Sequence, residues 1–458
     1  MKTLFVCATC LALLAGCQSY EPLPLDDRAH LGEWAKRSPA GKGVSEYVKT
    51  LGARDAKPAA PYNPADGISL AEAEVVALFF NPGLRTARLE AGVPLAGALE
   101  AGRWEDPELE LDATWIIDNV HTPWMLGAGI KFTIPLSGRP GVEQDLAWAE
   151  YDVTKREVVS SEWQALVALR EQWLEAAELA ERKRLLTEFV AALDRIRSVA
   201  DRLREAGVLS RLDARLFDLE VATRRLELDQ LDLRAKEARL RVLQAMGLHP
   251  EAPADLRFEL ALPPLPADNR DTLARDRNAD LAVLRARYQV AEQQLRLEVR
   301  KQYPDLAIGQ AYELDEGQSR ISLGFGIPIP IINLNKEGIA RARAARLAAR
   351  SDYEGMLEDV GHELAQAQVA LERARRNRRY VAETLSPLVD EQVEAARRLS
   401  ELGEFDALMQ LDALTRQYET RAVGLEAALE EARAATRLLA VLGPAFKAET
   451  RPEEAERD

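Results

Sequence analysis

The sequence predicts an α+β membrane protein built from two copies of one structural unit. The landmarks of the stretch Pro304 to Gly338 recur at Pro107 to Gly141, each pair separated by 197 positions (304 − 107). Each copy opens with two segments in which apolar and polar residues alternate, the period of a strand with one apolar face. Each then continues as a long stretch rich in strong helix formers. A fixed internal period takes precedence over any domain count from length alone.

Composition excludes several classes of function. The 75 acidic residues outnumber the 60 basic ones, for a net charge of −15, which disfavours nucleic acid and anionic lipid surfaces as partners. No nucleophile with a neighbouring base, no metal-ligand cluster and no phosphate-binding loop stands out. We therefore expect neither an enzyme nor a resident cofactor or metal.

Residues 1–16 have the features of an export signal. Lys2 supplies the positive charge, and Leu4 to Leu14 form an apolar segment shorter than the ~20 residues that span a bilayer as a helix. Leu14-Ala15-Gly16-Cys17 resembles the bacterial lipobox, in which the cysteine becomes the lipid-modified first residue. The alternative is an ordinary secretory signal. Gln18, in place of an aspartate, resembles the sorting pattern for the outer membrane.

The mature chain divides into five parts. Residues 17–67 are rich in proline, glycine and charge without a sustained period, and predict an extended, lipid-anchored arm. The two repeats follow at 68–249 and 270–443, joined by a linker at 250–269 that contains five prolines, and a charged tail occupies 444–458. Each repeat begins with leading helices, and Ser69 has the position of a helix N-cap in the first.

Strand hairpins are predicted at 108–134 and 305–330. Their strands are close to the roughly 9–11 residues that cross a bilayer as a tilted strand, although a half-buried hairpin of a soluble protein has the same alternation. Pro135 and Gly141 in the first copy correspond to a cluster containing Pro328 and Pro330, followed by Gly338, in the second. These residues mark the strand-to-helix turns, where a lost N–H matters least.

Long helical hairpins follow both strand pairs. The first ascending helix, Gly141 to Ala206, is predicted to measure about 100 Å at 1.5 Å per residue. Gly207 suits the turn and Ser210 caps the descending helix, whose leucines at 212, 219, 226, 233 and 240 form a heptad repeat. Gly403 marks the second turn. Pro387 has no counterpart in the first copy and is expected to kink or break the second ascending helix.

Four membrane-crossing strands cannot close a barrel, because an open sheet edge in lipid leaves backbone groups unsatisfied. Three copies would supply twelve strands, an even number within the range of outer-membrane barrels. Six helical hairpins would then extend into the periplasm as a tube. A homotrimer is the assembly that the strands predict.

The order of these elements, with Gly324 to Ile331 ending a strand and Asn335-Lys336-Glu337-Gly338-Ile339 opening a helix, resembles the TolC-type outer-membrane efflux proteins. The resemblance covers about residues 68–442 and is nearest to the lipid-anchored members, including the heavy-metal branch. It implies a trimeric exit channel in the outer membrane that extends into the periplasm. Its implied partners are a periplasmic adaptor (membrane fusion) protein and a proton-driven inner-membrane pump.

Site residues follow from this resemblance by position. A pair of acids at the periplasmic aperture of the family falls on Met409 and Asp412, so this chain keeps only one of the two acids; Asp412 would otherwise be a solvated surface acid. Adaptor docking is implied at the two helix tips. These tips contain Gly207, Val208, Leu209, Ser210 and Leu212 in the first repeat and Gly403, Glu404, Phe405 and Leu408 in the second.

Two other functions remain open at this point. The same channel could serve a type I protein or polysaccharide secretion system. A periplasmic coiled-coil adaptor or structural lipoprotein would also contain long helical hairpins, but an adaptor needs a separate soluble β-domain, which the two equal strand hairpins do not predict. Which substrate the protein exports cannot be derived from the sequence.

Overall fold

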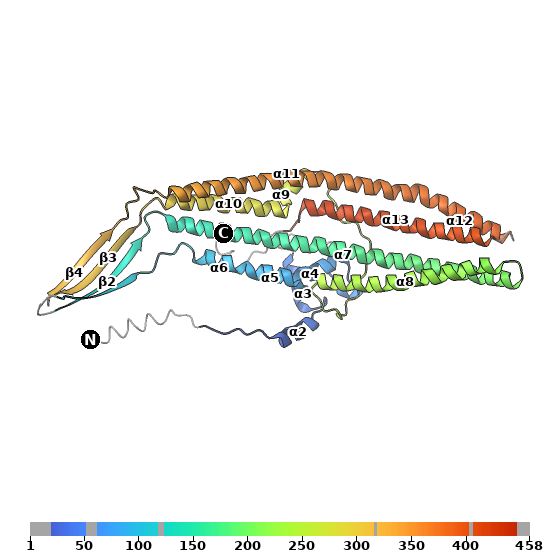
Figure 1. Cartoon of the computed structure of the whole chain (residues 1–458), viewed down its shortest axis with the longest axis horizontal. Helices are drawn as coiled ribbons and strands as arrows, with labels where there is room; N and C mark the ends of the chain where they lie inside the picture. The colour runs from blue at the N-terminus through green and yellow to red at the C-terminus, as the bar shows by residue number, and fades with distance from the viewer. Residues whose placement is uncertain (1–19, 52–61, 118–122, 316–317, 403–405, 447–458) are drawn as a thin grey trace.

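The computed structural model describes residues 20–51, 62–117, 123–315, 318–402 and 406–446. The molecule is elongated, with a sheet at one end and helical turns at the other (Figure 1). No helix in these ranges is both long enough and apolar enough to span a bilayer.

The first repeat contains α4 (Leu70–Phe80), α5 (Pro82–Glu90), α6 (Gly92–Glu100), β1 (Glu108–Trp115), β2 (Trp124–Ile134), α7 (Arg139–Glu205) and α8 (Arg211–Ala245). The second contains α9 (Arg270–Arg277), α10 (Ala279–Arg300), β3 (Leu306–Asp315), β4 (Gln318–Gly326), α11 (Lys336–Tyr380), α12 (Ser386–Glu401) and α13 (Ala407–Leu442). The same order of elements therefore occurs twice, as the 197-residue period predicts. The α+β fold with two strand pairs and two long helical hairpins is confirmed.

The four strands form one antiparallel sheet in the order β1-β2-β3-β4. Its register aligns Leu111 with Ala128, Ala128 with Tyr312, and Tyr312 with Ile321. Because side chains alternate between the faces of a strand, this register places the apolar positions of all four strands on one face. The two hairpins thus join into a single sheet with one apolar and one polar surface.

The two ascending helices differ in continuity. α7 runs unbroken for 67 residues, about 100 Å at 1.5 Å per residue. In the second repeat, α11 is followed by a π-helical turn over Val381–Leu385 before α12 begins. The interruption that Pro387 predicts is present, and its form is a widened turn of the helix.

The base of each hairpin is held by the same asparagine contact. Asn81 accepts a hydrogen bond from the Leu84 N–H (3.2 Å) and donates to the Ala245 carbonyl (2.9 Å). Asn278 does the same with Leu281 (3.0 Å) and Val441 (3.1 Å). Each asparagine therefore caps one helix and ties it to the end of the descending helix of its own repeat.

A glycine completes each of these joints. Gly247 has φ +70° and Gly443 has φ +81°, in the left-handed region. A Cβ at Gly247 would overlap the Phe80 carbonyl, and one at Gly443 would overlap the Arg277 carbonyl. The repeat is thus visible in backbone contacts as well as in sequence.

The N-terminal arm corrects one expectation. Residues 27–35 and 42–51 form helices α2 (Asp27–Ala35) and α3 (Lys42–Leu51), although an extended arm was predicted. Val44 and Leu51 of α3 are buried in the same core as α4 and α8. Both side chains lie on one face of α3 because they are seven residues apart, and a segment of only two to three turns gives too short a pattern for this period to stand out.

The arm docks on the joint of the first repeat. Arg37 donates to the Gly247 carbonyl at 2.8 Å, and its guanidinium lies 5.4 Å from the centre of the Phe80 ring. Trp34 meets His249 edge to face, with ring centroids 4.8 Å apart. These contacts fix the direction in which the chain leaves the helical body toward its N-terminus (Figure 1).

Glu72 links the start of α4 to the segment before it. Its carboxylate accepts hydrogen bonds from the Ser69 N–H (2.9 Å), the Ser69 hydroxyl (2.7 Å) and the Asn63 N–H (2.7 Å). Burial raises the pKa of Glu72, but these hydrogen bonds outweigh it and leave the pKa below its ordinary value. The capping signal at Ser69 is thus present as a full capping box.

Replacing Gly247 with alanine should destabilise the folded protein. The left-handed backbone alone costs an L-residue about 1–2 kcal/mol, and the overlap with the Phe80 carbonyl adds to it. Thermal unfolding of the detergent-solubilised protein should show a clear fall in Tm. Gly97→Ala on α6, where nothing lies within 4 Å of the added Cβ, is the matched control. Equal Tm values for the two variants would show that the contact between Gly247 and the Phe80 carbonyl does not require glycine.

Lowering the pH should weaken the start of α4. Because the folded-state pKa of Glu72 is lowered, its stabilising contribution is complete above the ordinary carboxyl pKa and is lost as the pH falls through the folded value. We expect Glu72→Gln to show a smaller fall in Tm between pH 7 and pH 4 than the parent protein. Glu46→Gln, at an exposed position on α3, should behave as the parent, and an unchanged acid response in Glu72→Gln would rule out this linkage.

Candidate functional site

The apolar face of the sheet is exposed in the single chain. Large side chains project from it with no covering element among the described residues. They include Leu109, Leu111, Trp124, Leu126, Ile130, Phe132, Ile321, Leu323 and Phe325. A contiguous apolar surface of this kind marks contact with a membrane or another protein.

The opposite face of the sheet is charged. Lys131 lies 3.0 Å from the Glu108 carboxylate and 3.9 Å from Glu110, and Glu313 lies directly opposite Arg320 in the register. The two outer strands, β1 and β4, each pair on one side only. The sheet is therefore amphipathic and has two open backbone edges.

The strand-to-helix turns contain the predicted residues, and contacts that the sequence did not indicate hold them in place. Pro135 directly follows β2, Pro328 and Pro330 follow the end of β4, and Gly141 lies inside α7. In the first turn, the Ser137 hydroxyl donates to the Asp305 carboxylate at 2.8 Å. This contact ties the start of α7 to the start of β3.

The second turn depends on a left-handed asparagine. Asn335 has φ +49°, and its amide donates to the Glu298 carbonyl (2.9 Å) and carboxylate (2.6 Å). A Cβ at Gly338 would overlap this Glu298–Asn335 pair. Both turns thus rely on contacts between residues far apart in sequence, which no local pattern contains.

The first helix tip lies at the end opposite the sheet. Gly207 has φ +75°, and Ser210 accepts from the Asp213 N–H at 3.1 Å as the N-cap of α8. Val208 and Leu212 are exposed. Leu209 instead packs against Ala200 and Phe217, so its side chain supports the turn.

The second tip is described only in part. Gly403, Glu404 and Phe405 lie outside the described residues, as does Cys17. Asp406 caps α13 by accepting from the N–H groups of Leu408 (2.9 Å) and Met409 (3.1 Å). Asp406 was not among the residues predicted from the sequence, although an aspartate just before a helical stretch is a recognised N-cap signal. The Leu408 side chain is exposed.

Asp412 and Met409 lie on α13 within its first two turns. The Asp412 carboxylate accepts from Arg416 at 2.8 Å, one helical turn further on, and from the Gln392 amide of α12 at 3.4 Å. Met409 is half-buried. Asp412 therefore has a cationic neighbour on its own helix.

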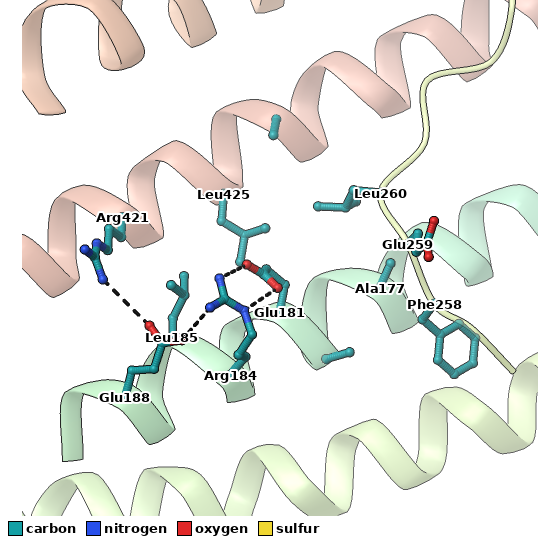
Figure 2. Close-up of a pocket in the computed structure, with 12 residues that line it drawn as sticks. Ala177, Glu181, Arg184, Leu185, Glu188, Phe258, Glu259, Leu260, Arg421 and Leu425 are labelled. Carbon is teal, nitrogen blue, oxygen red and sulfur yellow. Dashed lines mark hydrogen bonds and ion pairs between the residues drawn. The ribbon is translucent and has the colours of Figure 1, made fainter. Parts of the chain in front are cut away.

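A groove of about 910 Å³ separates α7 from α13 midway along the helical body. Figure 2 shows Glu181, Arg184 and Glu188 on α7 facing Arg421 and Leu425 on α13. Arg184 bridges the two glutamates, with Nη1 2.5 Å from Glu188, and Arg421 lies 3.7 Å from Glu188. Phe258 and Leu260 of the linker line the other wall. The charges in this groove are largely paired with one another.

No group of three or more potential metal ligands occurs within the residues that the structure describes. The features that remain are an amphipathic sheet with open edges, two long hairpins and their exposed tips. They are surfaces that can contact a membrane, another copy of the chain or another protein.

Comparison with known proteins finds a family model that matches the second repeat. The model of the outer membrane efflux protein family matches residues 272–444. The cobalt-zinc-cadmium resistance protein CzcC of Cupriavidus metallidurans is 23% identical over 396 residues, covering 86% of this chain and 91% of CzcC.

Solved structures share the fold. The outer-membrane channel OprN aligns with a TM-score of 0.69 and 18% identity over 93% of this chain and 98% of its own. The open-state MtrE outer membrane channel of Neisseria gonorrhoeae aligns with a TM-score of 0.69 and 17% identity over 83% and 90%. With the duplicated strand and helix hairpins, these matches show that the chain has the fold of the TolC-type outer-membrane channels.

Proposed function

We propose that three copies of this chain form the outer-membrane exit duct of a tripartite efflux system. The duct conducts passively what an inner-membrane pump and a periplasmic adaptor deliver to it. In this assembly each sheet contributes four of twelve strands, and the hairpins form a tube in the periplasm. The observation that carries the proposal is a difference in burial between equivalent positions of the two repeats.

On the descending helices, the equivalent positions lie 196 apart (429 − 233). Leu429 of α13 is only 3% exposed because it packs on Leu174 of α7, whereas its counterpart Leu233 of α8 is 61% exposed. Thr436 is 2% exposed and its counterpart Leu240 is 47% exposed. The same helix face is thus covered in the second repeat and open in the first.

The leading helices give the same contrast. Ala286 of α10 is 3% exposed, while its counterpart Leu89 of α5 is 69% exposed. In both comparisons the second repeat is covered by packing on α7, an element of the first repeat. By the same relation, the first repeat should be covered by α11 and α12 of a neighbouring copy. This contact is head-to-tail, and such contacts form a ring when the rotation between copies closes, as the closure of the sheet into a barrel would require.

The sheet supports the same assembly. The open edges of β1 and β4 need partners in lipid, where an unpaired backbone group costs several kcal/mol. Pairing β4 of one copy with β1 of the next closes the barrel, with the apolar face toward lipid and the charged face toward the lumen. Trp115 and Trp124, in edge-to-face contact at 4.7 Å, suit the aromatic girdle at a membrane interface.

Partners and anchoring extend this proposal. Val208 and Leu212 at the first tip and Leu408 at the second are exposed apolar residues suited to the adaptor. Lipid attachment at Cys17 would hold the arm at the outer membrane. The cargo we propose is divalent metal cations, in keeping with the resistance named for CzcC; a charged lumen face with Glu108 and Glu110 is compatible with their passage.

Acidic substitutions in the exposed leucine stripe of α8 should abolish the trimer. Leu226→Glu with Leu233→Glu places charge where a neighbouring copy would pack, so native mass spectrometry should show monomers, and planar bilayers should show no conductance. Val423→Glu, at an exposed apolar position of α13, is the control and should remain trimeric. If the parent protein is monomeric and gives no conductance in planar bilayers under any condition tested for channel opening, the channel proposal is contradicted.

Removing the carboxylate of Asp412 should reduce cation preference. If three copies of Asp412 line the periplasmic aperture, Asp412→Ala weakens cation selectivity or divalent-ion block, because charged side-chain rings set such selectivity. Reversal potentials in salt gradients measure it. Asp201→Ala on α7, a partly exposed acid paired with Arg204, should leave selectivity unchanged. If Asp412→Ala shows the same selectivity and divalent-ion block as the parent, Asp412 is a solvated surface acid with no role in selectivity.

A further inference from the structure

A cavity of about 690 Å³ lies where the two repeats meet. Its walls come from α4 and α7 of the first repeat, from the linker, and from α9 and α13 of the second repeat, and α4 and α9 lie at the same level of the molecule (Figure 1). Small-molecule sites in proteins measure roughly 300–1,000 Å³. The helices proposed to contact a neighbouring copy, α5, α8, α11 and α12, contribute no described residue to its lining. One copy of the chain therefore contains the whole cavity.

Most of the lining is apolar. Trp173 and Leu78 are buried and form part of the wall. Leu70, Leu273 and Leu439 also line the cavity, but each is only half-buried, so part of its apolar surface stays in contact with water. Covering such surface is favourable in proportion to its area. The cavity thus suits a ligand with an apolar body.

The linker supplies a wall that holds its shape. Three of the four residues 263–266 are prolines, which have a fixed φ and no N–H that would need an acceptor inside an apolar cavity. Before them, the Arg257 N–H donates to the Ile68 carbonyl (2.9 Å), and the Arg257 side chain pairs with Asp66 (2.9 Å). After them, Arg270 donates to the carbonyl at 266 (3.0 Å). Both ends of this wall are therefore tied to the body of the protein.

Arg170 is the principal polar group of the cavity. Its Nε donates to the Glu74 carboxylate, and its guanidinium lies 5.4 Å from the centre of the Trp163 ring. Its Nη1 is buried and has no hydrogen-bond partner among the described residues. A buried donor without an acceptor is unfavourable, and a carboxylate is the acceptor that best matches a guanidinium. A ligand oxygen placed here would supply the missing acceptor.

A second arginine reinforces the preference for an anion. Arg277 of α9 lines the cavity, is exposed, and forms no ion pair within the part of the chain that the structure describes. The two acids of the lining compete little for an anionic head group, because Glu74 is paired with Arg170 and Glu259 is exposed on the linker. Guanidinium donors are thus available both within the cavity and at its surface.

We infer that this cavity binds a carboxylate with a single alkyl chain, a molecule of the fatty-acid class. The chain lies among the leucines and prolines of the walls, and the carboxylate is held by Arg170, with Arg277 able to reach it from the surface. Gly443, at the joint of the second repeat, also lines the cavity, so a bound ligand would contact elements of both repeats and stabilise their packing. This inference does not depend on the channel function, since the site is complete in one copy.

Binding of decanoate to the full-length protein in detergent tests the inference. Equilibrium dialysis of labelled decanoate, below the concentration at which it forms micelles, should show saturable binding of one molecule per chain and a rise in Tm. Decan-1-ol, which has the same chain without the charge, should bind roughly tenfold more weakly, the factor for one charge-assisted hydrogen bond. Decylamine should show no saturable binding, because its cation would face the guanidinium groups. Equal binding of all three compounds would contradict a carboxylate site.

Filling the cavity should abolish this binding. Ala71 lines the cavity and is half-buried at the start of α4, so Ala71→Phe places a ring in the space proposed for the alkyl chain. Ala29→Phe, at an exposed position in the first turn of α2, is the matched control and should bind decanoate as the parent does. Since all variants are measured in the same detergent, uptake of decanoate by micelles is common to them and cancels in the comparison.

Removing the charged pair should abolish the preference for the carboxylate. Glu74→Gln with Arg170→Met removes both partners together, so neither is left as an unpaired buried charge, and decanoate should then bind only as weakly as decan-1-ol does. Native mass spectrometry and Tm show whether each variant is folded, and if Ala71→Phe is not, the pair variant still decides. A parent without saturable decanoate binding, or a pair variant that keeps the preference for decanoate, refutes the site. Conductance of the parent in planar bilayers is measured separately and decides only the channel proposal.

Discussion

The constraint on which the structure depends is that a four-stranded sheet cannot satisfy its own edges in a membrane. β1 and β4 each pair on one side only, and the face they share carries exposed apolar side chains such as Leu111 and Phe325. In lipid, both problems have one solution, which is to continue the sheet through neighbouring copies until it closes. The helical hairpins would share the symmetry of this closure, because the Ser137–Asp305 contact ties the start of α7 to the start of β3. The Asn335–Glu298 contact ties the start of α11 to α10, the helix that precedes β3.

Because the chain contains two copies of one structural unit, equivalent contacts can be compared between its two repeats. The asparagine and glycine joints at Asn81 with Gly247 and at Asn278 with Gly443 repeat contact for contact. Where equivalent positions differ, as Leu233 and Leu429 do in exposure, the second repeat packs on α7 and the first repeat has no such cover within the described residues. In the proposed trimer, the contact between α7 and α13 is the intramolecular counterpart of the contact with the next copy.

Much of this architecture was predictable from the sequence because it depends on local periods. The alternation at 124–134 matches β2, the long proline-free stretch matches α7, and the glycine turn at 207 separates α7 from α8. What sequence did not indicate depends on contacts between distant residues: α3 is fixed by burial of Val44 and Leu51 against α4, and the strand-to-helix turns by Asp305 and Glu298. Pro387 predicted an interruption, but a π turn is only one of several ways to absorb a proline, and local pattern does not choose among them.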